Sequence, residues 1–329
     1  MSISRRSILK VLPTLALPAP VLPLLSGCKS GPAEPQREAR PAPPAISRSE
    51  REVRLIVPSV ATSDGAGVKL RRALGAKSLS MLDPFLLLDE MRSDKPEDYR
   101  AGFPTHPHRG FETVTYVIEG AADHKDSLGN EGHLGAGSAQ WMTAGRGIVH
   151  SEMPTHDATS ERLWALQLWV NLPASLKMGK PRYQDIPKQR IPELSVDGSR
   201  VRLVAGQVGG SRGPVEGIAT SPMMFDVTVE PRGRFVHATP PGHNAFVYVL
   251  DGAVSFGEER KVVQRGEVGV LTAGERITMS SEAGGRVLFF AGRPIGEPVA
   301  RSGPFVMNTE AELEKAWSDY RKGRLVTSG

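Results

Sequence analysis

The chain has 329 residues and a formal charge of +5, with 35 glycines, 27 prolines and a single cysteine. The many glycines and prolines, together with scarce helical runs, favour an all-β protein with many turns. Without residues 1–28 the chain has 38 basic and 36 acidic side chains, a charge of +2. This balance lacks the electrostatic footprint of a nucleic-acid-binding protein, and one cysteine excludes a disulfide within the chain.

The first residues have the pattern of an export signal. SRRSILK at 4–10 matches the twin-arginine motif. The apolar run that follows is too short and too proline-rich for a good membrane-spanning helix, and it ends in LSGC at 25–28, which resembles the lipoprotein cleavage box. We therefore expect 1–28 to be a signal peptide, Cys28 to be lipidated, and the protein to be a periplasmic or cell-envelope lipoprotein. The alternative is a plain secretory signal with a buried, inert cysteine.

The position of the anchor follows from the same region. In a Gram-negative source, Lys29 directly after the cysteine favours the outer membrane, since aspartate at that position is the usual signal for retention in the inner membrane. Residues 29–50 are rich in proline, alanine and charge, and are predicted to form an extended tether between the anchor and the folded body.

The folded body repeats itself. YVIEG at 116–120 matches YVLDG at 248–252, and TAG at 143–145 matches TAG at 272–274, at offsets of 132 and 129 residues. Two anchors in the same order at nearly the same spacing predict a duplicated lobe. In each lobe, short strands with turn signals every few residues favour a small β-barrel or jelly roll.

The predicted organisation is an N-terminal lobe at 51–175, a linker at 176–198, and a C-terminal lobe at 199–329 that ends in a helix. Thr309 and Glu312 form a candidate capping box for that helix. Its apolar stripe is expected to pack against the core rather than to form a binding site.

Four candidate metal ligands occur in the first lobe as two short pairs, HPH at 106–108 and HSE at 150–152. The members of each pair are two residues apart, so on a β-strand both side chains point to one face. Two such strands facing each other would place His106, His108, His150 and Glu152 around one ion. Three imidazoles and a carboxylate, without a thiolate, suit Fe(II), Mn(II), Co(II), Ni(II) or Cu(II), and they also accept Zn(II).

The repeat provides an internal comparison for these ligands. At the offset of 132 residues, His106 and His108 correspond to Ala238 and Pro240. At the offset of 129 residues, the pair at 150 and 152 corresponds to Met279 and Ser281. The second lobe therefore keeps the scaffold and lacks all four candidate ligands. Core packing alone does not explain their presence in the first lobe.

A carboxylate lies close to the first pair. If strand geometry continues from His106 across Pro107 and Gly110, then Glu112 shares the histidines' face and that face lines the barrel interior. Val114, Tyr116 and Ile118 would follow on the same face. We interpret Glu112 as a residue that orients a ligating imidazole, rather than as a ligand.

Other histidines and tryptophans are given simpler interpretations. His124, His133 and His156 occur in loop-like stretches and are interpreted as solvated surface residues. The tryptophans on strand-like segments are expected in the core or in the lining of a pocket; they are Trp141, Trp164 and Trp169.

The motifs together resemble the pirin family, a bicupin group. The matching stretches are LDPFLLLDE at 82–90, HPHRGFETVTYVIEG at 106–120, QWMTAGRGIVHSEMP at 140–154, QLWVNLP at 167–173 and PFVMNTEAELEKAW at 304–317. The resemblance covers roughly residues 52–326. It implies two stacked cupin barrels with the metal, usually iron, in the first, ligated at the four positions named above.

The resemblance also implies a function. Members of the family are known as quercetin 2,3-dioxygenases and, in eukaryotes, as an iron-dependent nuclear co-regulator; the export signal argues against a transcriptional role for this chain. We therefore expect a monomeric, Fe(II)-dependent dioxygenase that takes O2 and a flavonol-like or other enolisable aromatic substrate. Glu152 is the expected proton acceptor from the substrate hydroxyl. The alternative is a non-catalytic metal-binding or redox-sensing bicupin of the cell envelope.

Overall fold

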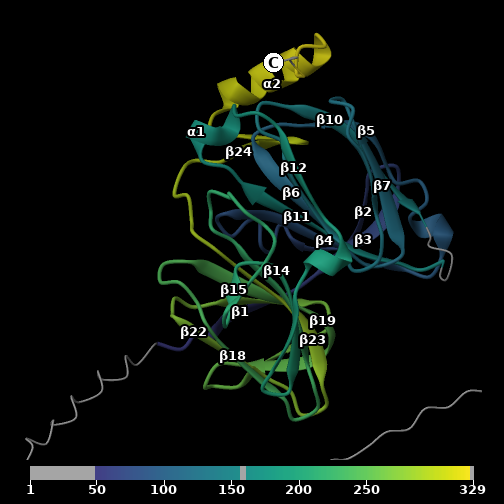
Figure 1. Cartoon of the computed structure of the whole chain (residues 1–329). Coiled ribbons are helices and arrows are strands. Elements are labelled where there is room, and N and C mark those ends of the chain that lie inside the picture. The colour runs from purple at the N-terminus through teal and green to yellow at the C-terminus, as the bar shows by residue number, and fades with distance from the viewer. Residues whose placement is uncertain (1–48, 156–160, 327–329) are drawn as a thin grey trace, which may run out of the picture. The chain divides into compact units, whose positions relative to one another are not determined.

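The computed structural model describes residues 49–155 and 161–326 (Figure 1). The expected signal peptide, the lipidated Cys28 and residues 29–48 of the tether lie outside the described residues, as does His156. In the part of the chain that is described, no helix combines the length and the apolar character needed to cross a membrane.

The first lobe is built from two antiparallel sheets. The larger has the strand order β12-β9-β6-β11-β4-β3-β2, and the smaller has the order β5-β10-β7-β8. The bounds are β2 (Val60–Asp64), β3 (Val68–Leu74), β4 (Phe85–Ser93), β5 (Phe103–His108), β6 (Phe111–Glu119), β7 (Ala121–Asp126), β8 (Glu131–Leu134), β9 (Ala139–Thr143), β10 (Ile148–Thr155), β11 (Leu163–Asn171) and β12 (Arg182–Ile186).

The second lobe is built around one ten-stranded sheet, whose main path is β1-β21-β19-β23-β17-β14-β13. The bounds are β1 (Val53–Pro58), β13 (Glu193–Val196), β14 (Ser199–Ala205), β17 (Met223–Val229), β18 (Arg234–Ala238), β19 (Asn244–Phe256), β20 (Lys261–Gln264), β21 (Glu267–Leu271), β22 (Arg276–Ser280) and β23 (Gly285–Gly292). The remaining elements are η1 (Pro96–Asp98), α1 (Ala174–Lys177), η2 (Lys188–Arg190), β15 (Gln207–Val208), β16 (Ser211–Arg212), β24 (Ala300–Ser302), β25 (Phe305–Met307) and α2 (Glu310–Arg321).

The predicted all-β, duplicated fold with one C-terminal helix is confirmed. The two copies of the YVIEG/YVLDG motif lie on β6 and β19, each the third strand in the order of its large sheet. The helix begins with the predicted capping box, in which Thr309 accepts a hydrogen bond from the Glu312 amide and Glu312 accepts one from the Thr309 amide. Its apolar side packs in a cluster with Phe305 and Met307, as expected.

The two lobes share one apolar core. Val114, Tyr116 and Leu166 of the first lobe pack with Phe246 and residues of the second. These side chains come from the outer faces of the two large sheets, so burial holds the lobes together as a sandwich does.

The predicted facing of β6 is wrong. Val114 and Tyr116 point into the core between the lobes, whereas Thr115 lines the pocket beside the histidines. The cause is Gly110, which has a φ of +89° between the end of β5 and the start of β6. Strand geometry does not continue across this turn, so the alternation changes phase by one residue.

Each lobe is completed by the opposite end of the chain. β1 pairs with β21 of the second lobe, and Arg51, nearly fully buried, hydrogen-bonds the carbonyls of Thr272 and His243 there. In return, α2 and β25 pack against β10 of the first lobe; Figure 1 shows the yellow helix beside β10. The boundary expected at residue 51 therefore shifts, since the first lobe's own strands begin at β2.

The region expected to be a linker, residues 176–198, contributes one strand to each of the two large sheets. β12 pairs with β9 of the first lobe, and β13 pairs with β14 of the second. The apolar side chain of Ile186 is buried, which ties this segment to the first barrel.

Candidate metal centre

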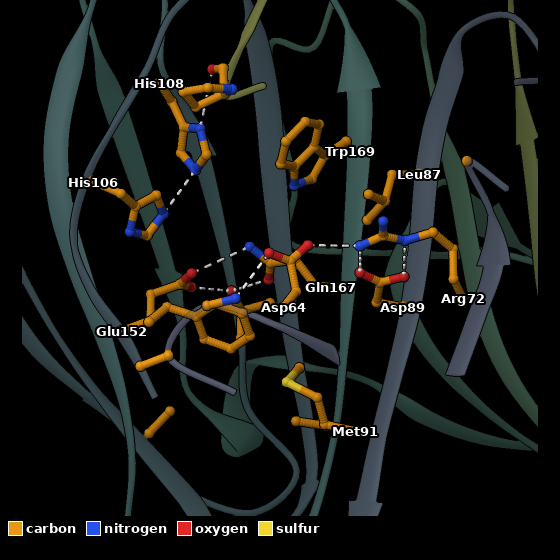
Figure 2. Close-up of a pocket in the computed structure, with 18 of the residues that line it drawn as sticks. Asp64, Arg72, Leu87, Asp89, Met91, His106, His108, Glu152, Gln167 and Trp169 are labelled. Carbon is orange, nitrogen blue, oxygen red and sulfur yellow. Dashed lines mark hydrogen bonds and ion pairs between the residues drawn. The ribbon is translucent and has the colours of Figure 1, made fainter. Parts of the chain in front are cut away.

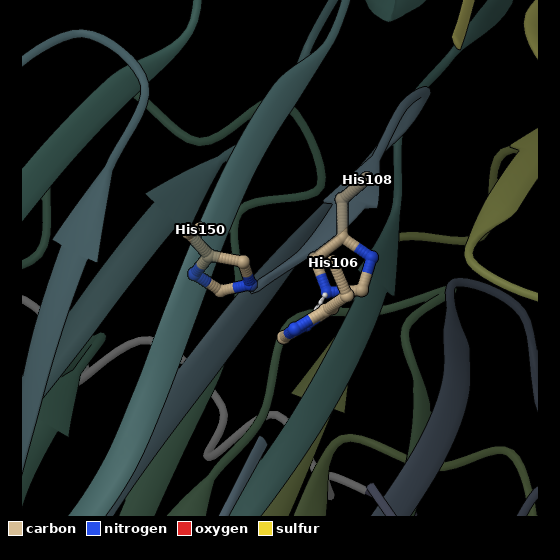
Figure 3. A group of neighbouring side chains, drawn as sticks. All are labelled: His106, His108 and His150. Carbon is tan, nitrogen blue, oxygen red and sulfur yellow. Dashed lines mark hydrogen bonds between the residues drawn. The ribbon is translucent and has the colours of Figure 1, made fainter. Parts of the chain in front are cut away.

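Three of the four predicted ligands lie together. One ring nitrogen from each of His106, His108 and His150 lies within 4.8 Å of the others (Figure 3). The first two come from β5 and the third from β10, where His150 is directly opposite His106 in the antiparallel register. The alternation of side chains on paired strands, inferred above for each pair, places the three imidazoles on one wall.

The hydrogen bonds of the imidazoles leave nitrogen lone pairs for a cation. His106 Nδ1 lies 2.8 Å from the Pro104 carbonyl and His108 Nδ1 lies 3.3 Å from the Pro304 carbonyl. A carbonyl oxygen only accepts, so both Nδ1 atoms are the donors and both Nε2 atoms carry lone pairs. Those two Nε2 atoms face each other at 3.0 Å. Two lone pairs at this distance repel unless a positive centre lies beside them.

His150 supports the same interpretation. Its side chain is buried, and neither Nδ1 nor Nε2 has a hydrogen-bond partner among the described residues. A buried polar atom without a partner costs about 1–3 kcal/mol, and a metal ion removes this cost for a coordinating nitrogen. The residues present therefore fit a divalent transition metal.

Burial also keeps two of the imidazoles neutral. Desolvation, followed by the charges of the neighbouring histidines, lowers the pKa of His108 well below its usual value, and the pKa of His150 is lowered in the same way. A neutral imidazole is the form that binds a metal.

Glu152 lies on the same strand as His150 but is held apart from the imidazole group. Thr115 Oγ1 lies 2.8 Å from Glu152 Oε1, and Gln167 Nε2 donates to Glu152 Oε2 at 3.3 Å. The register of β10 against β5 shifts between His150 and Glu152, so this pair departs from the simple i, i+2 geometry. Figure 2 shows the carboxylate below the imidazoles, directed toward Gln167.

His106, His108 and Glu152 line one large pocket, with a volume of about 920 Å³. Its walls include Trp169, Leu87 and Met91, and the ion pair of Arg72 with Asp89 lies across the cavity from Glu152 (Figure 2). The indole ring of Trp169 lies 5.3 Å from the His108 ring, edge to face. This volume is within the range of small-molecule sites, and the lining combines apolar side chains with many polar and charged ones.

Glu112 occupies a different environment from the one expected. It lies on β6 in phase with Val114, and its Oε1 accepts a hydrogen bond from Thr143. It is buried, and burial raises its pKa to about 7. No hydrogen bond joins it to an imidazole in the described structure, so its predicted orienting role finds no support in the geometry.

The surface interpretation of His124 is wrong, and that of His133 is confirmed. His124 is buried on β7, stacked on Tyr183 and hydrogen-bonded to the Gln140 amide. His133 is exposed and pairs with Asp123. The residues around His124 are typical of turns, so the sequence did not indicate that they form a strand, β7, which pairs with β10.

Sequence reasoning also missed the polar residues that contact Glu152. Gln167 stands alone among apolar residues in LWALQLWV at 163–170, and a single polar residue in a buried strand is a usable signal for a site. Thr115 carried no such signal, because threonine is common in strands. Of the tryptophans, Trp169 lines the pocket, while Trp141 and Trp164 lie in the core between the lobes, as expected for this class of residue.

In the second lobe, apolar side chains occupy the barrel interior that holds the candidate metal ligands in the first lobe. Met279 and Phe235 fill the corresponding interior, and both are fully buried. β18 pairs with β22 there as β5 pairs with β10 in the first lobe.

Comparisons with known proteins agree with this geometry. The family model described as Pirin matches residues 67–170, and the Pirin C-terminal cupin domain matches residues 224–326. A pirin-like protein of Caulobacter vibrioides is 45% identical over 83% of this chain and 99% of its own length. Human pirin is 39% identical over 84% of this chain and 94% of its own length. A crystal structure of quercetin 2,3-dioxygenase from Acinetobacter baumannii superposes with a TM-score of 0.77 at 31% identity, covering 85% of this chain and 99% of that one.

Proposed function

The chain belongs to the pirin family, and on that premise we propose that it is a metal-dependent dioxygenase of the quercetin 2,3-dioxygenase type. Its substrate is a flavonol-like or other enolisable aromatic compound. The observation that supports this most is the convergence of three imidazoles, of which those of His106 and His108 line a pocket of about 920 Å³. Such a volume accommodates an aromatic compound of several rings.

The proposed ligands are His106, His108 and His150, with Glu152 as the fourth, and Fe(II) is the proposed ion; Mn, Co, Ni, Cu and Zn are also compatible with this donor set. When bound, the ion supplies Lewis acidity toward a substrate hydroxyl and the redox chemistry that O2 requires. The Pro104 and Pro304 carbonyls fix the two β5 imidazoles by their Nδ1 atoms, which keeps both Nε2 atoms directed to one point.

Glu152 is the proposed proton acceptor. Its carboxylate faces the pocket, and the weaker of its two contacts, from Gln167 at 3.3 Å, is at Oε2. A proton from a substrate hydroxyl is received at this oxygen, while Thr115 holds Oε1 in place. Trp169, Leu87 and Met91 supply the apolar surface against which an aromatic ring packs.

The test combines metal analysis with turnover. Purified protein, loaded in turn with each candidate metal, is given quercetin, and oxygen uptake and carbon monoxide release are measured. We expect one ion per chain and turnover with at least one metal. His108→Ala should lose both and keep the far-ultraviolet dichroism of the fold, while His133→Ala, at an exposed histidine, should keep both. Metal uptake without turnover for any flavonol would instead favour a non-catalytic metal-binding or redox-sensing protein.

We also propose that the protein is exported as a monomer by the twin-arginine route and anchored by lipid at Cys28. The motifs at residues 4–10 and 25–28 support this. Radiolabelled palmitate should be incorporated into the wild type and not into Cys28→Ser, and replacement of Arg5 and Arg6 by lysine should leave the protein in the cytoplasm. Labelling of the Cys28→Ser variant would contradict the anchor.

A further inference from the structure

One cation in the pocket lining lacks an acidic partner. The lining of the pocket includes two arginines, Arg72 and Arg301. Arg72 forms two hydrogen bonds with Asp89 and one with Asp64, so its charge is neutralised locally. Arg301 lies near the same groups, yet within residues 49–155 and 161–326 no carboxylate is within ion-pair distance of it.

The guanidinium of Arg301 is nonetheless held in position. Its carbon Cζ lies 4.6 Å from the centre of the Trp169 ring, a cation–π contact. One N–H donates to the Leu86 carbonyl at 3.3 Å. A guanidinium carries five N–H donors, so the contact with Leu86 leaves most of them for another acceptor. The side chain keeps access to solvent, and partial burial together with the Arg72 charge lowers its pKa.

Trp169 connects this cation to the metal centre. One face of the indole carries Arg301, and the ring meets the imidazole of His108 edge to face at 5.3 Å. A single aromatic ring therefore separates the guanidinium from a proposed metal ligand. A substrate whose hydroxyl lies at the histidines and whose next ring packs beside Trp169 would present its far end to Arg301.

We propose that Arg301 binds a carboxylate of the substrate, so that the pocket selects an anionic aromatic compound over its neutral analogue. This rests on the proposed function, because it places the enolisable hydroxyl at the metal centre. The planar guanidinium fork matches a carboxylate with two parallel hydrogen bonds. Arg301 comes from β24, in the segment that follows the second lobe, so this C-terminal segment supplies the selectivity of a site whose proposed ligands all belong to the first lobe.

The experiment compares two probes that differ only in charge. 3,4-Dihydroxybenzoate and 3,4-dihydroxybenzamide both carry vicinal hydroxyls, and one ring separates these from the variable group. Titration calorimetry on nickel-loaded protein gives both dissociation constants. It is carried out without O2, which the proposed reaction requires. A charge-assisted contact contributes on the order of tenfold or more in affinity. We expect the benzoate to bind the wild type at least about tenfold more tightly, and Arg301→Gln to bring the ratio close to one.

The controls separate a binding role from a structural one. Arg301→Lys should keep part of the preference, because it keeps the charge, and Arg212→Gln, at an exposed arginine of the second lobe, should keep all of it. Equal affinities in the wild type, or a preference that persists in Arg301→Gln, overturns the proposal. Failure to bind any of the candidate metals overturns the proposed function instead. In that case, binding of 3,4-dihydroxybenzoate and 3,4-dihydroxybenzamide to the metal-free protein is measured by ligand-observed nuclear magnetic resonance. Comparison of the wild type with Arg301→Gln then still decides whether Arg301 distinguishes the two compounds.

Discussion

Tyr116 and Tyr248, which occupy the same position in the two repeats, each donate a hydrogen bond to a buried carboxylate of the opposite lobe. Tyr116 reaches Asp226 at 2.7 Å, and Tyr248 reaches Glu90 at 2.6 Å. Each carboxylate has a second donor in its own lobe, Arg286 for Asp226 and Trp164 for Glu90. The interface between the lobes therefore contains two equivalent polar contacts within an apolar core. The duplicated tyrosine fixes the orientation of one lobe relative to the other.

Removal of either hydroxyl should weaken the interface by a similar amount. Tyr116→Phe and Tyr248→Phe each leave a buried carboxylate with one donor fewer, and we expect each to lower the free energy of unfolding by roughly 1–3 kcal/mol. The partners of the two sites touch, because Arg286 Cζ lies 5.3 Å from the centre of the Trp164 ring, so the double variant should deviate from the sum of the single changes. Urea unfolding measures this. Tyr320→Phe, whose ring packs in the α2 cluster, is the control and should change little.

Stability should depend on pH through Glu112. Burial raises the pKa of Glu112 to about 7 in the folded protein, whereas an unfolded chain loses this proton near the usual pKa of 4.5. Between these values the folded state binds more protons, so the free energy of unfolding falls as pH rises through this range, by roughly 3 kcal/mol in total. Urea midpoints of the wild type and Glu112→Gln, compared from pH 4.5 to 8, should diverge in this window. Parallel curves for the two proteins would show that Glu112 does not titrate there.

Glu152→Gln should separate metal binding from proton transfer. The amide keeps the shape of the carboxylate next to Thr115 and Gln167 but cannot accept a proton at neutral pH. We expect turnover of the preferred flavonol to fall by roughly 10²–10⁴-fold, the usual contribution of a general base. Metal content by elemental analysis should change much less than it does in His108→Ala. Loss of the ion in Glu152→Gln would show that the carboxylate acts mainly as a metal ligand and not as the proton acceptor.

Lys177 should be essential for the local structure around the site. It is fully buried, and its ammonium donates to the Gly110 carbonyl, Asn171 Oδ1 and the Val306 carbonyl. Burial lowers its pKa to about 8. Lys177→Met leaves three buried acceptors unpaired and should cost roughly 2–5 kcal/mol of stability, measured by thermal and urea unfolding. Lys180→Met, at an exposed lysine of the next turn, should be neutral.

The sequence was sufficient for the features that depend on periodicity and repetition. Alternation placed His106 and His108 on one face, and the repeat predicted a second lobe without ligands; both rest on local geometry that strands impose. The capping box of α2 is local in the same sense, because its two partners are three residues apart.

The features that sequence reasoning missed depend on long-range packing. A single left-handed glycine, Gly110, inverted the facing of β6. The pairing of β1 with β21 joins residues more than two hundred positions apart, and no local pattern marks a strand that crosses to the other lobe. His124 looked exposed because its neighbours are turn-forming residues, and only the register with β10 buries it.

The crossing of the chain ends has a practical consequence for dissection of the molecule. A gene fragment that stops after the first barrel would encode His106, His108, His150 and Glu152, yet it would lack the Pro304 carbonyl beside His108, the Val306 carbonyl beside Lys177, and Arg301. Such a fragment would therefore lack contacts that position the candidate metal site. The chain passes through the lobe without ligands before its C-terminal segment packs against the first lobe, and β1, at the other end, pairs with the second lobe. Each duplicated lobe therefore depends on the other half of the chain for its complete structure.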